Sequence, residues 1–164
     1  MYYFCTMLNR IQTVKIHWSK PILFDNRWNS QNFNEEIGLY IISRRYIRNG
    51  FFHEKYIYVG ETTNTFEIRC NQHLDKWSSW LNTIAQKYIR FGRIDHIPTI
   101  VDNIKHFVWT IESAIIQAII NLPNVELLNV KQVNSYSIWY DLVIENKGYR
   151  GTLPTHINTR DYYN

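Results

Sequence analysis

The chain has 164 residues, of which 45% are hydrophobic and 20% charged, a composition that excludes a disordered protein and predicts one globular domain over residues 1–164. Its net charge of +4 fits a polyanionic partner without requiring one. Two cysteines without paired spacing exclude a disulfide framework, and no apolar run approaches the ~20 residues of a membrane span, so we expect a cytoplasmic protein without membrane contact.

The first third of the chain predicts β-structure. Residues 12–18 alternate between apolar and polar side chains, which is typical of a strand, and Pro21 follows it. Residues 39–43 and 56–59 are rich in β-branched and aromatic side chains and predict two further strands. The intervening residues 44–55 are basic, and we expect them to form a long hairpin connection.

Helical signals begin after this hairpin. Asn64, followed three residues later by Glu67, predicts a helix start of the capping-box kind, and apolar residues then recur at helical spacing over residues 66–77. We expect the later elements to be a helix over residues 80–91, a strand over 105–110, an apolar helix over 111–122 and a strand over 136–145.

This order of elements predicts an α/β (α+β) fold class. We expect a small, mainly antiparallel central sheet of about three strands flanked by helices, with β-containing extensions at both termini.

Three polar side chains in the helical segments are candidates for chemistry. Arg69 and His73 are four residues apart and therefore lie on one helix face, where a guanidinium offers a planar fork of donors to a phosphate. The alternative is a surface arginine and a half-buried histidine. Glu112 opens the apolar helix, where a carboxylate is either stabilised by the helix N-terminus or binds a metal ion.

Two short glycine-containing blocks flank the predicted hairpin. Tyr40 and Tyr58 lie in strands, where tyrosine is common, so neither indicates a function by itself. Gly60 ends its strand before the turn into a helix, a place where the backbone is able to approach a ligand closely.

Taken together, these residues resemble the GIY-YIG nuclease superfamily, in particular its restriction-endonuclease-like members. The resemblance covers a catalytic core of about residues 38–129, with flanking extensions 1–37 and 130–164. The chain departs from the family pattern at Leu39 and Val59 and in the longer gap between the two blocks. The matching features are Gly38-Leu39-Tyr40, Tyr58-Val59-Gly60, the Arg69-x-x-x-His73 pair, Glu112 at the start of an apolar helix and Asn129 after it.

The resemblance implies a divalent-metal-dependent endonuclease that hydrolyses phosphodiester bonds. One Mg²⁺ or Mn²⁺ ion per active site would bind Glu112, without a small-molecule cofactor, and Arg69 would hold a phosphate oxygen. Tyr40 is the candidate general base, and nearby positive charge is expected to lower its pKa. Tyr58 and His73 are alternatives that would position the base or share the proton. Asn129 would support the site through hydrogen bonds.

The expected partner is double-stranded DNA. A basic patch on the hairpin connection would bind its phosphates, although a solvated loop explains the same charges; the patch comprises Arg44, Arg45, Arg48 and Lys55. Polar residues of the last stretch, such as Asn146 and Arg150, are candidates for contacts with base edges.

Modest flanks without a linker favour a compact type II restriction enzyme, and a symmetric target would imply a homodimer. One alternative is a phage or mobile-element endonuclease, homing-like or structure-selective. Another is a non-catalytic nucleic-acid-binding module on the same fold. A structural interaction protein would explain the six tryptophans as core and interface, but not the ordered polar residues.

Overall fold

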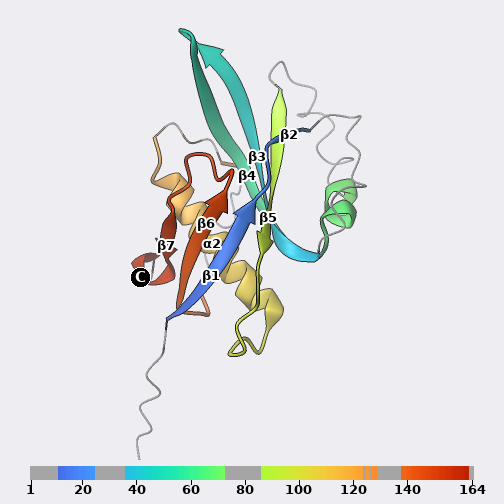
Figure 1. Cartoon of the computed structure of the whole chain (residues 1–164), viewed down its shortest axis with the longest axis vertical. Helices are drawn as coiled ribbons and strands as arrows, with labels where there is room; N and C mark the ends of the chain where they lie inside the picture. The colour runs from blue at the N-terminus through green and yellow to red at the C-terminus, as the bar shows by residue number, and fades with distance from the viewer. Residues whose placement is uncertain are drawn as a thin grey trace, which may run out of the picture.

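The computed structural model describes residues 11–24, 36–72, 86–123, 125, 127–128 and 138–162. Within these residues seven strands form one sheet of order β4-β3-β5-β1-β6-β7, with β2 paired to β5 (Figure 1). The strands are β1 (Gln12–Trp18), β2 (Ile22–Leu23), β3 (Glu36–Arg48), β4 (Phe51–Thr65), β5 (Lys87–Ile94), β6 (Leu142–Gly148) and β7 (His156–Asn158). Residues 66–72 are helical, and the helix α2 (Ile104–Ile120) and the 3₁₀ helix η1 (Thr159–Tyr162) follow.

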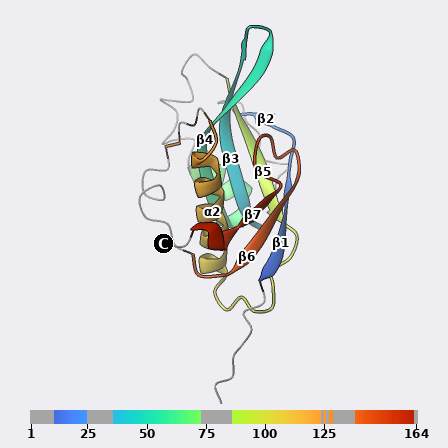
Figure 2. The same cartoon turned by 90° about the vertical axis from the view of Figure 1, so that its left-hand side faces the viewer.

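The β3–β4 hairpin projects beyond the rest of the sheet (Figures 1 and 2). Asn49 and Gly50 form its turn with φ angles of 53° and 79°, the left-handed backbone that tight hairpin turns require. The predicted strands at residues 39–43 and 56–59 are confirmed. The expected connection over residues 44–55 is wrong, because all but the turn residues continue the ladder.

The expected fold class is also wrong, because the sheet is mixed and larger than three strands. Strands from both predicted extensions join it: β1 pairs in parallel with β6 over seven residue pairs, and β6 pairs with β7. The alternating apolar residues of β1, such as Val14 and Ile16, are fully buried in the same cluster as Ile144 of β6. Since an apolar strand face needs cover, these strands complete the sheet beneath α2.

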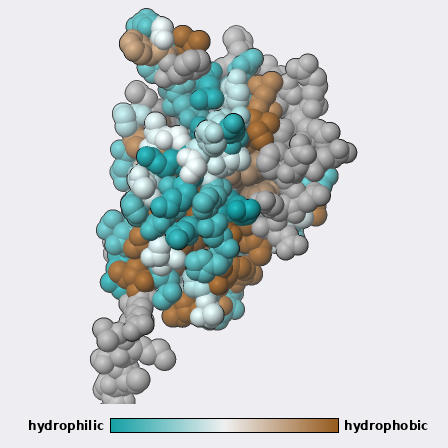
Figure 3. All heavy atoms as spheres, viewed as in Figure 1, coloured by the Kyte–Doolittle hydropathy of each residue, from teal (hydrophilic) through white to brown (hydrophobic). Residues whose placement is uncertain are grey.

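The two faces of the sheet carry separate apolar cores. The larger core lies under α2 and includes Ile111 and Ile115 of that helix. The smaller core includes Phe66 and Cys70 of the helical residues 66–72, together with Tyr40. The side chains of β1 that point away from α2 are exposed, and hydrophilic residues predominate in the middle of the face shown in Figure 3.

Two expected elements have the wrong type. The predicted strand over residues 105–110 is the first part of α2, which begins after Asn103, whose side chain accepts a 3.1 Å hydrogen bond from the His106 amide. The predicted helix over residues 80–91 is a strand, β5, from Lys87 onward, and residues 80–85 lie outside the described residues.

Three element boundaries also differ from the prediction. The helical residues 66–72 are capped by Thr65 rather than Asn64, since its hydroxyl accepts a 3.3 Å hydrogen bond from the Ile68 amide. α2 starts earlier than the predicted residue 111, and β6 starts later than the predicted residue 136. Among the helices of the described residues, none has the length and apolar character needed to cross a membrane.

Candidate active site at the edge of strand β4

Four of the candidate residues meet at the edge of the sheet formed by β4. Tyr40 comes from β3, Tyr58 from β4, Arg69 from the helical residues 66–72 and Glu112 from α2. Arg69 interacts electrostatically with both tyrosines and with Glu112. Residues as far apart in sequence as Tyr40 and Glu112 therefore both lie close to the Arg69 guanidinium.

The two tyrosines are packed against each other. Their ring centroids are 6.1 Å apart with planes inclined by 28°, and their side chains are joined by a hydrogen bond. The Arg69 side chain also forms a hydrogen bond with Tyr40. Tyr40 is completely buried, whereas Tyr58 is half-buried. Tyr58 is therefore the phenol of the pair that solvent reaches.

Both glycines of the short blocks are explained by packing. Gly60 lies opposite Tyr40 in the β3–β4 ladder, and a Cβ atom on Gly60 would collide with the Tyr40 ring. A Cβ atom on Gly38 would collide with the carbonyl of Gly92 on β5 and with the Phe66 ring. The close approach expected at Gly60 is therefore made by a tyrosine of the chain itself.

The pKa values of both phenols are shifted upward. Burial raises the pKa of Tyr40 well above its usual value, Tyr58 adds to this, and Arg69 only partly opposes it. Burial, followed by the Glu112 carboxylate, raises the pKa of Tyr58. The expected lowering of the Tyr40 pKa by Arg69 is outweighed, because loss of hydration penalises a buried phenolate more than one guanidinium stabilises it.

Glu112 lies deeper than its predicted place at the start of a helix. Because α2 begins at Ile104, Glu112 is about two turns into the helix, beyond the reach of the N-terminal dipole. Its side chain is 4% exposed, and burial followed by the nearby Glu61 raises its pKa to about 8. A helix-end explanation for this carboxylate therefore fails.

Glu61 is a site residue that the sequence analysis missed. Its Oε1 accepts a 3.3 Å hydrogen bond from Nε1 of Trp109 on α2, while its Oε2 is buried and accepts no hydrogen bond from the described residues. It borders a polar pocket of about 270 Å³ whose other lining residues are Thr62, Thr63, Asn64, Ile68, Arg69 and Gln72. Its position directly after Gly60 is the available signal.

Two predicted site residues, His73 and Asn129, lie outside the described residues. The described neighbours of both are near the site. The helix carries Arg69 and continues to Gln72, whose Oε1 lies 3.4 Å from Arg69 Nη1. The amide of Leu128 donates a 2.7 Å hydrogen bond to the carbonyl of Ile57, the residue before Tyr58.

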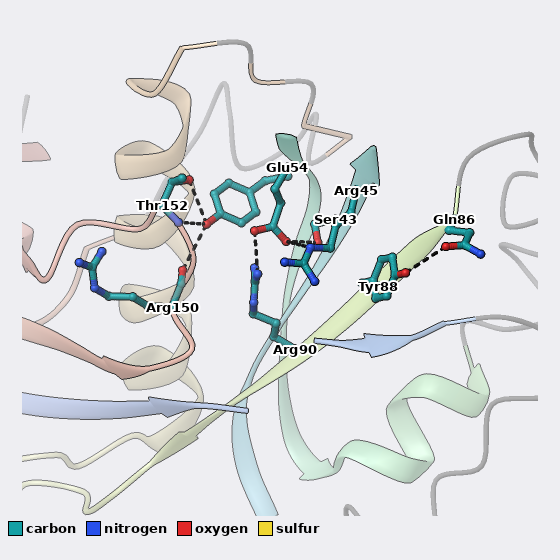
Figure 4. A network of polar contacts seen from close by, with 9 residues as sticks. Ser43, Arg45, Glu54, Gln86, Tyr88, Arg90, Arg150 and Thr152 are labelled. Carbon is teal, nitrogen blue, oxygen red and sulfur yellow. Dashed lines mark hydrogen bonds and ion pairs between the residues drawn. The ribbon is translucent and has the colours of Figure 1, made fainter. Parts of the chain in front are cut away.

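The predicted basic patch is divided between the two faces of the hairpin. Arg44 and Lys55 are cross-strand partners and therefore point to the same face. Arg45 points to the other face, where it lies 3.9 Å from Glu54 and 5.4 Å from the centre of the Tyr88 ring. Figure 4 shows Arg45 in this network, in which Arg90 also contacts Glu54 at 2.6 Å. Arg45 is therefore engaged within the protein.

A third cation joins Arg44 and Lys55 on their face. Lys87 of β5 pairs with Arg44 in the ladder, so a row of three basic residues crosses β4, β3 and β5. Burial, followed by Arg44, lowers the pKa of Lys87. Arg48, near the turn, is exposed. Lys87 was not among the predicted DNA contacts, because the local sequence predicts a helix at this position.

No family model, curated protein or solved structure matches this chain. The resemblance to the GIY-YIG nucleases therefore depends on the sequence motifs alone.

Proposed function

We propose that this protein is a divalent-metal-dependent endonuclease of the GIY-YIG type that hydrolyses phosphodiester bonds in double-stranded DNA. Within that class we propose a compact type II restriction enzyme acting in the cytoplasm. The observation that supports this most strongly is the convergence of Tyr40, Tyr58, Arg69 and Glu112 at the β4 edge. Phosphodiester hydrolysis requires activation of water, stabilisation of charge on the phosphate and neutralisation of the leaving oxygen.

Arg69 is assigned to the phosphate. Its side chain borders the polar pocket, and its Nε atom is buried without a hydrogen bond to the described residues. A guanidinium with unused donors fits a phosphate oxygen, and its charge stabilises the negative charge that grows there during attack.

Glu112 is assigned to the metal ion. A carboxylate that is 4% exposed and lies near Arg69 and the two tyrosines fits a hard divalent cation, which prefers oxygen ligands. Bound Mg²⁺ or Mn²⁺ would supply charge neutralisation at the phosphate and at the leaving oxygen. Among the described residues no group of three histidine, cysteine or acidic side chains surrounds it, so water and substrate phosphate would complete the coordination.

Tyr58 is assigned to the attacking water, since it is the phenol that solvent reaches. Tyr40 then acts as the positioning residue between Arg69 and Tyr58. The Glu112 carboxylate raises the pKa of Tyr58, so neutralising that carboxylate with a cation would lower this pKa and increase the fraction of Tyr58 present as phenolate, the form that accepts a proton. His73 is the alternative acceptor.

DNA contact is assigned to the hairpin face that carries Arg44 and Lys55, together with Arg48 near the turn. These cations would bind backbone phosphates and make the affinity depend on salt. The same face of β3 carries Tyr40, so phosphates bound there would continue toward the site. A homodimer is the expected form on a symmetric DNA target.

Digestion of supercoiled plasmid in Mg²⁺ or Mn²⁺, followed by sequencing of the fragment ends, tests this function. Arg69→Ala and Glu112→Gln should each lower the cleavage rate by about 100-fold or more, because each removes stabilisation of transition-state charge. Lys15→Ala is the control, since Lys15 is an exposed cation on β1, which β3 and β5 separate from β4 in the sheet. Lack of cleavage with every divalent ion, or unchanged rates in both variants, would contradict the proposal.

A second candidate is a nucleic-acid-binding protein without catalysis. It is favoured by one observation: Tyr40 and Glu112 are almost completely buried, whereas Arg48 on the hairpin is exposed. A gel shift on DNA that Arg48→Ala weakens, without cleavage in any divalent ion, would identify this function. Cleavage without a common end sequence would instead indicate a phage or mobile-element nuclease of low specificity.

A further inference from the structure

We propose that Glu61 is a second carboxylate ligand of the divalent cation at Glu112 and that Trp109 positions it. This inference rests on the proposed function only for the identity of the cation as the nuclease metal. The resemblance assigns the metal to Glu112 alone, and Glu61 belongs to neither of the glycine-containing blocks.

The geometry of α2 and β4 brings the two carboxylates together. Trp109 precedes Glu112 by three residues, so both side chains lie on one face of α2. The Trp109 indole Nε1 donates a 3.3 Å hydrogen bond to Glu61 Oε1, which holds the Glu61 carboxylate against that face. The strand therefore presents Glu61 to the same part of the helix that carries Glu112.

Glu61 and Glu112 have few positive charges around them among the described residues. Glu61 Oε2 is buried and accepts no hydrogen bond from the described residues, and Glu112 is 4% exposed. Glu61 lies close enough to Glu112 for the two carboxylates to repel each other when both are ionised. Arg69 is the one positive group among the described residues that opposes this repulsion at Glu112. When both carboxyl groups are ionised, two negative charges stand beside a single guanidinium, and a bound cation would stabilise this ionised form.

The surroundings also suit a hard cation that takes only some of its ligands from the protein. Two carboxylates provide oxygen ligands. The polar pocket that Glu61 and Arg69 border, which Glu112 does not line, has room on the Glu61 side for water or a phosphate oxygen. Magnesium and manganese sites in phosphoryl enzymes commonly combine one or two carboxylates with waters and substrate oxygens.

Terbium luminescence provides a direct test on the full-length protein. Tb³⁺ binds hard oxygen ligands and emits when a nearby tryptophan is excited, and Trp109 contacts Glu61. We expect Glu61→Gln and Glu112→Gln each to weaken Tb³⁺ binding, and Mn²⁺ binding measured by calorimetry, by at least about tenfold. Such a loss is expected when one of two charged ligands becomes neutral.

Glu67→Gln is the matched control. Glu67 lies on the helical residues two positions before Arg69, about 200° around the helix, so its removal should leave both affinities within about twofold. Each variant is also melted in EDTA. Glu61→Gln and Glu112→Gln should melt close to the wild-type temperature, because glutamine keeps the shape of glutamate and its Oε1 can still accept the Trp109 hydrogen bond at position 61. Weak binding with this result cannot be attributed to unfolding.

The outcomes separate this inference from the proposed function. If Glu112→Gln loses Tb³⁺ while Glu61→Gln binds like the wild type, the role of Glu61 is overturned and the nuclease proposal stands. If both variants lose Tb³⁺ but the wild type cleaves no DNA, the two-carboxylate site stands and the nuclease proposal fails. A wild-type protein that binds neither Tb³⁺ nor Mn²⁺ overturns the site.

Discussion

The contact between Gly60 and Tyr40 connects the backbone of β4 to the candidate site. Gly60 is buried and stands opposite Tyr40 in the ladder, and the ring of Tyr40 lies where a Gly60 side chain would be. This position lets the Tyr40 hydroxyl reach both Arg69 and Tyr58. A missing side chain on one strand therefore fixes the orientation of a phenol on the next.

Gly60→Ala should destabilise the protein by about 2–3 kcal/mol, because the added methyl group overpacks a buried site and displaces Tyr40. The loss is measured as a lower urea midpoint with an unchanged m-value. Thr63→Ala, an exposed position on the same strand, is the control and should change stability by about 0.5 kcal/mol or less.

A double-mutant cycle isolates the cause. If the Tyr40 ring is what the methyl group meets, combining Gly60→Ala with Tyr40→Leu should cost less than the sum of the single changes by about 1 kcal/mol or more. Additive losses would show that the strain at Gly60 lies elsewhere in β4.

At this scale the sequence predicted candidate residues that the fold brings together, but it did not predict their surroundings, and the catalytic roles of these residues remain predictions. Tyr40, Tyr58, Arg69 and Glu112 were found by residue type and order, and they share one charge cluster. Glu61 was missed because its role depends on facing α2, and the pairing of a strand with a particular helix face is a tertiary property. His73 and Asn129 remain predictions.

At the scale of elements, α2 shows why a short apolar run is ambiguous. Residues 105–110 mix β-branched and aromatic side chains, which favour a strand, yet they form the start of a helix. The deciding signal is Asn103, whose side chain caps the helix through the His106 amide. Because the cap precedes this run, the helix extends from it and carries Glu112 into the interior.

Strand β5 was misassigned for a related reason. Its residues are buried on both faces of the sheet, since Ile89 and Phe91 enter the smaller core while Arg90 is buried on the other side. A strand covered on both faces lacks the polar alternation by which strands are recognised. Its pairing with β3 and β1 is long-range and leaves no local signal.

Strand β6 is tied to its neighbours by a buried side chain that the sequence suggested as a DNA contact. Asn146 is 1% exposed; its Oδ1 accepts a 2.8 Å hydrogen bond from Trp18 Nε1 and its Nδ2 donates a 2.9 Å bond to the Pro154 carbonyl. The amide therefore joins β6 to β1 and to the segment that leads into β7. It is not available to read bases.

Asn146→Ala should lower the free energy of unfolding by about 2–4 kcal/mol, since it leaves the Trp18 donor and the Pro154 acceptor buried without partners. Urea unfolding followed by circular dichroism measures the change. The neighbouring Lys147→Ala removes an exposed ion pair with Glu145 and should cost less than about 1 kcal/mol. A variant at Asn146 with unchanged stability but weaker DNA binding would support the base-contact role instead.

At the scale of the whole molecule, the terminal segments contribute to the core that holds α2 in place. Leu142 and Ile144 of β6 and Ile157 of β7 are buried in the same cluster as Ile111 and Ile115 of α2. Glu112, next to Ile111, depends on this packing for its position at the β4 edge. The motifs alone could not show this, because they lie within residues 38–129 and most of the supporting strands lie outside that range.

A fragment of residues 38–129 should consequently fail to fold on its own, even though it contains every motif residue. It retains α2 but lacks β1, β6 and β7, so the buried face of α2 and the β5 edge that pairs with β1 would be exposed to water. Circular dichroism and urea titration should show no cooperative transition, whereas the full chain should unfold cooperatively.

A chain ending at residue 137, which lacks only β6, β7 and η1, should behave like the fragment. Adding residues 138–164 as a separate peptide should restore part of the transition, because β6 can pair again with β1. Cooperative unfolding of the 38–129 fragment near the full-length midpoint would instead establish an autonomous catalytic core with accessory terminal strands.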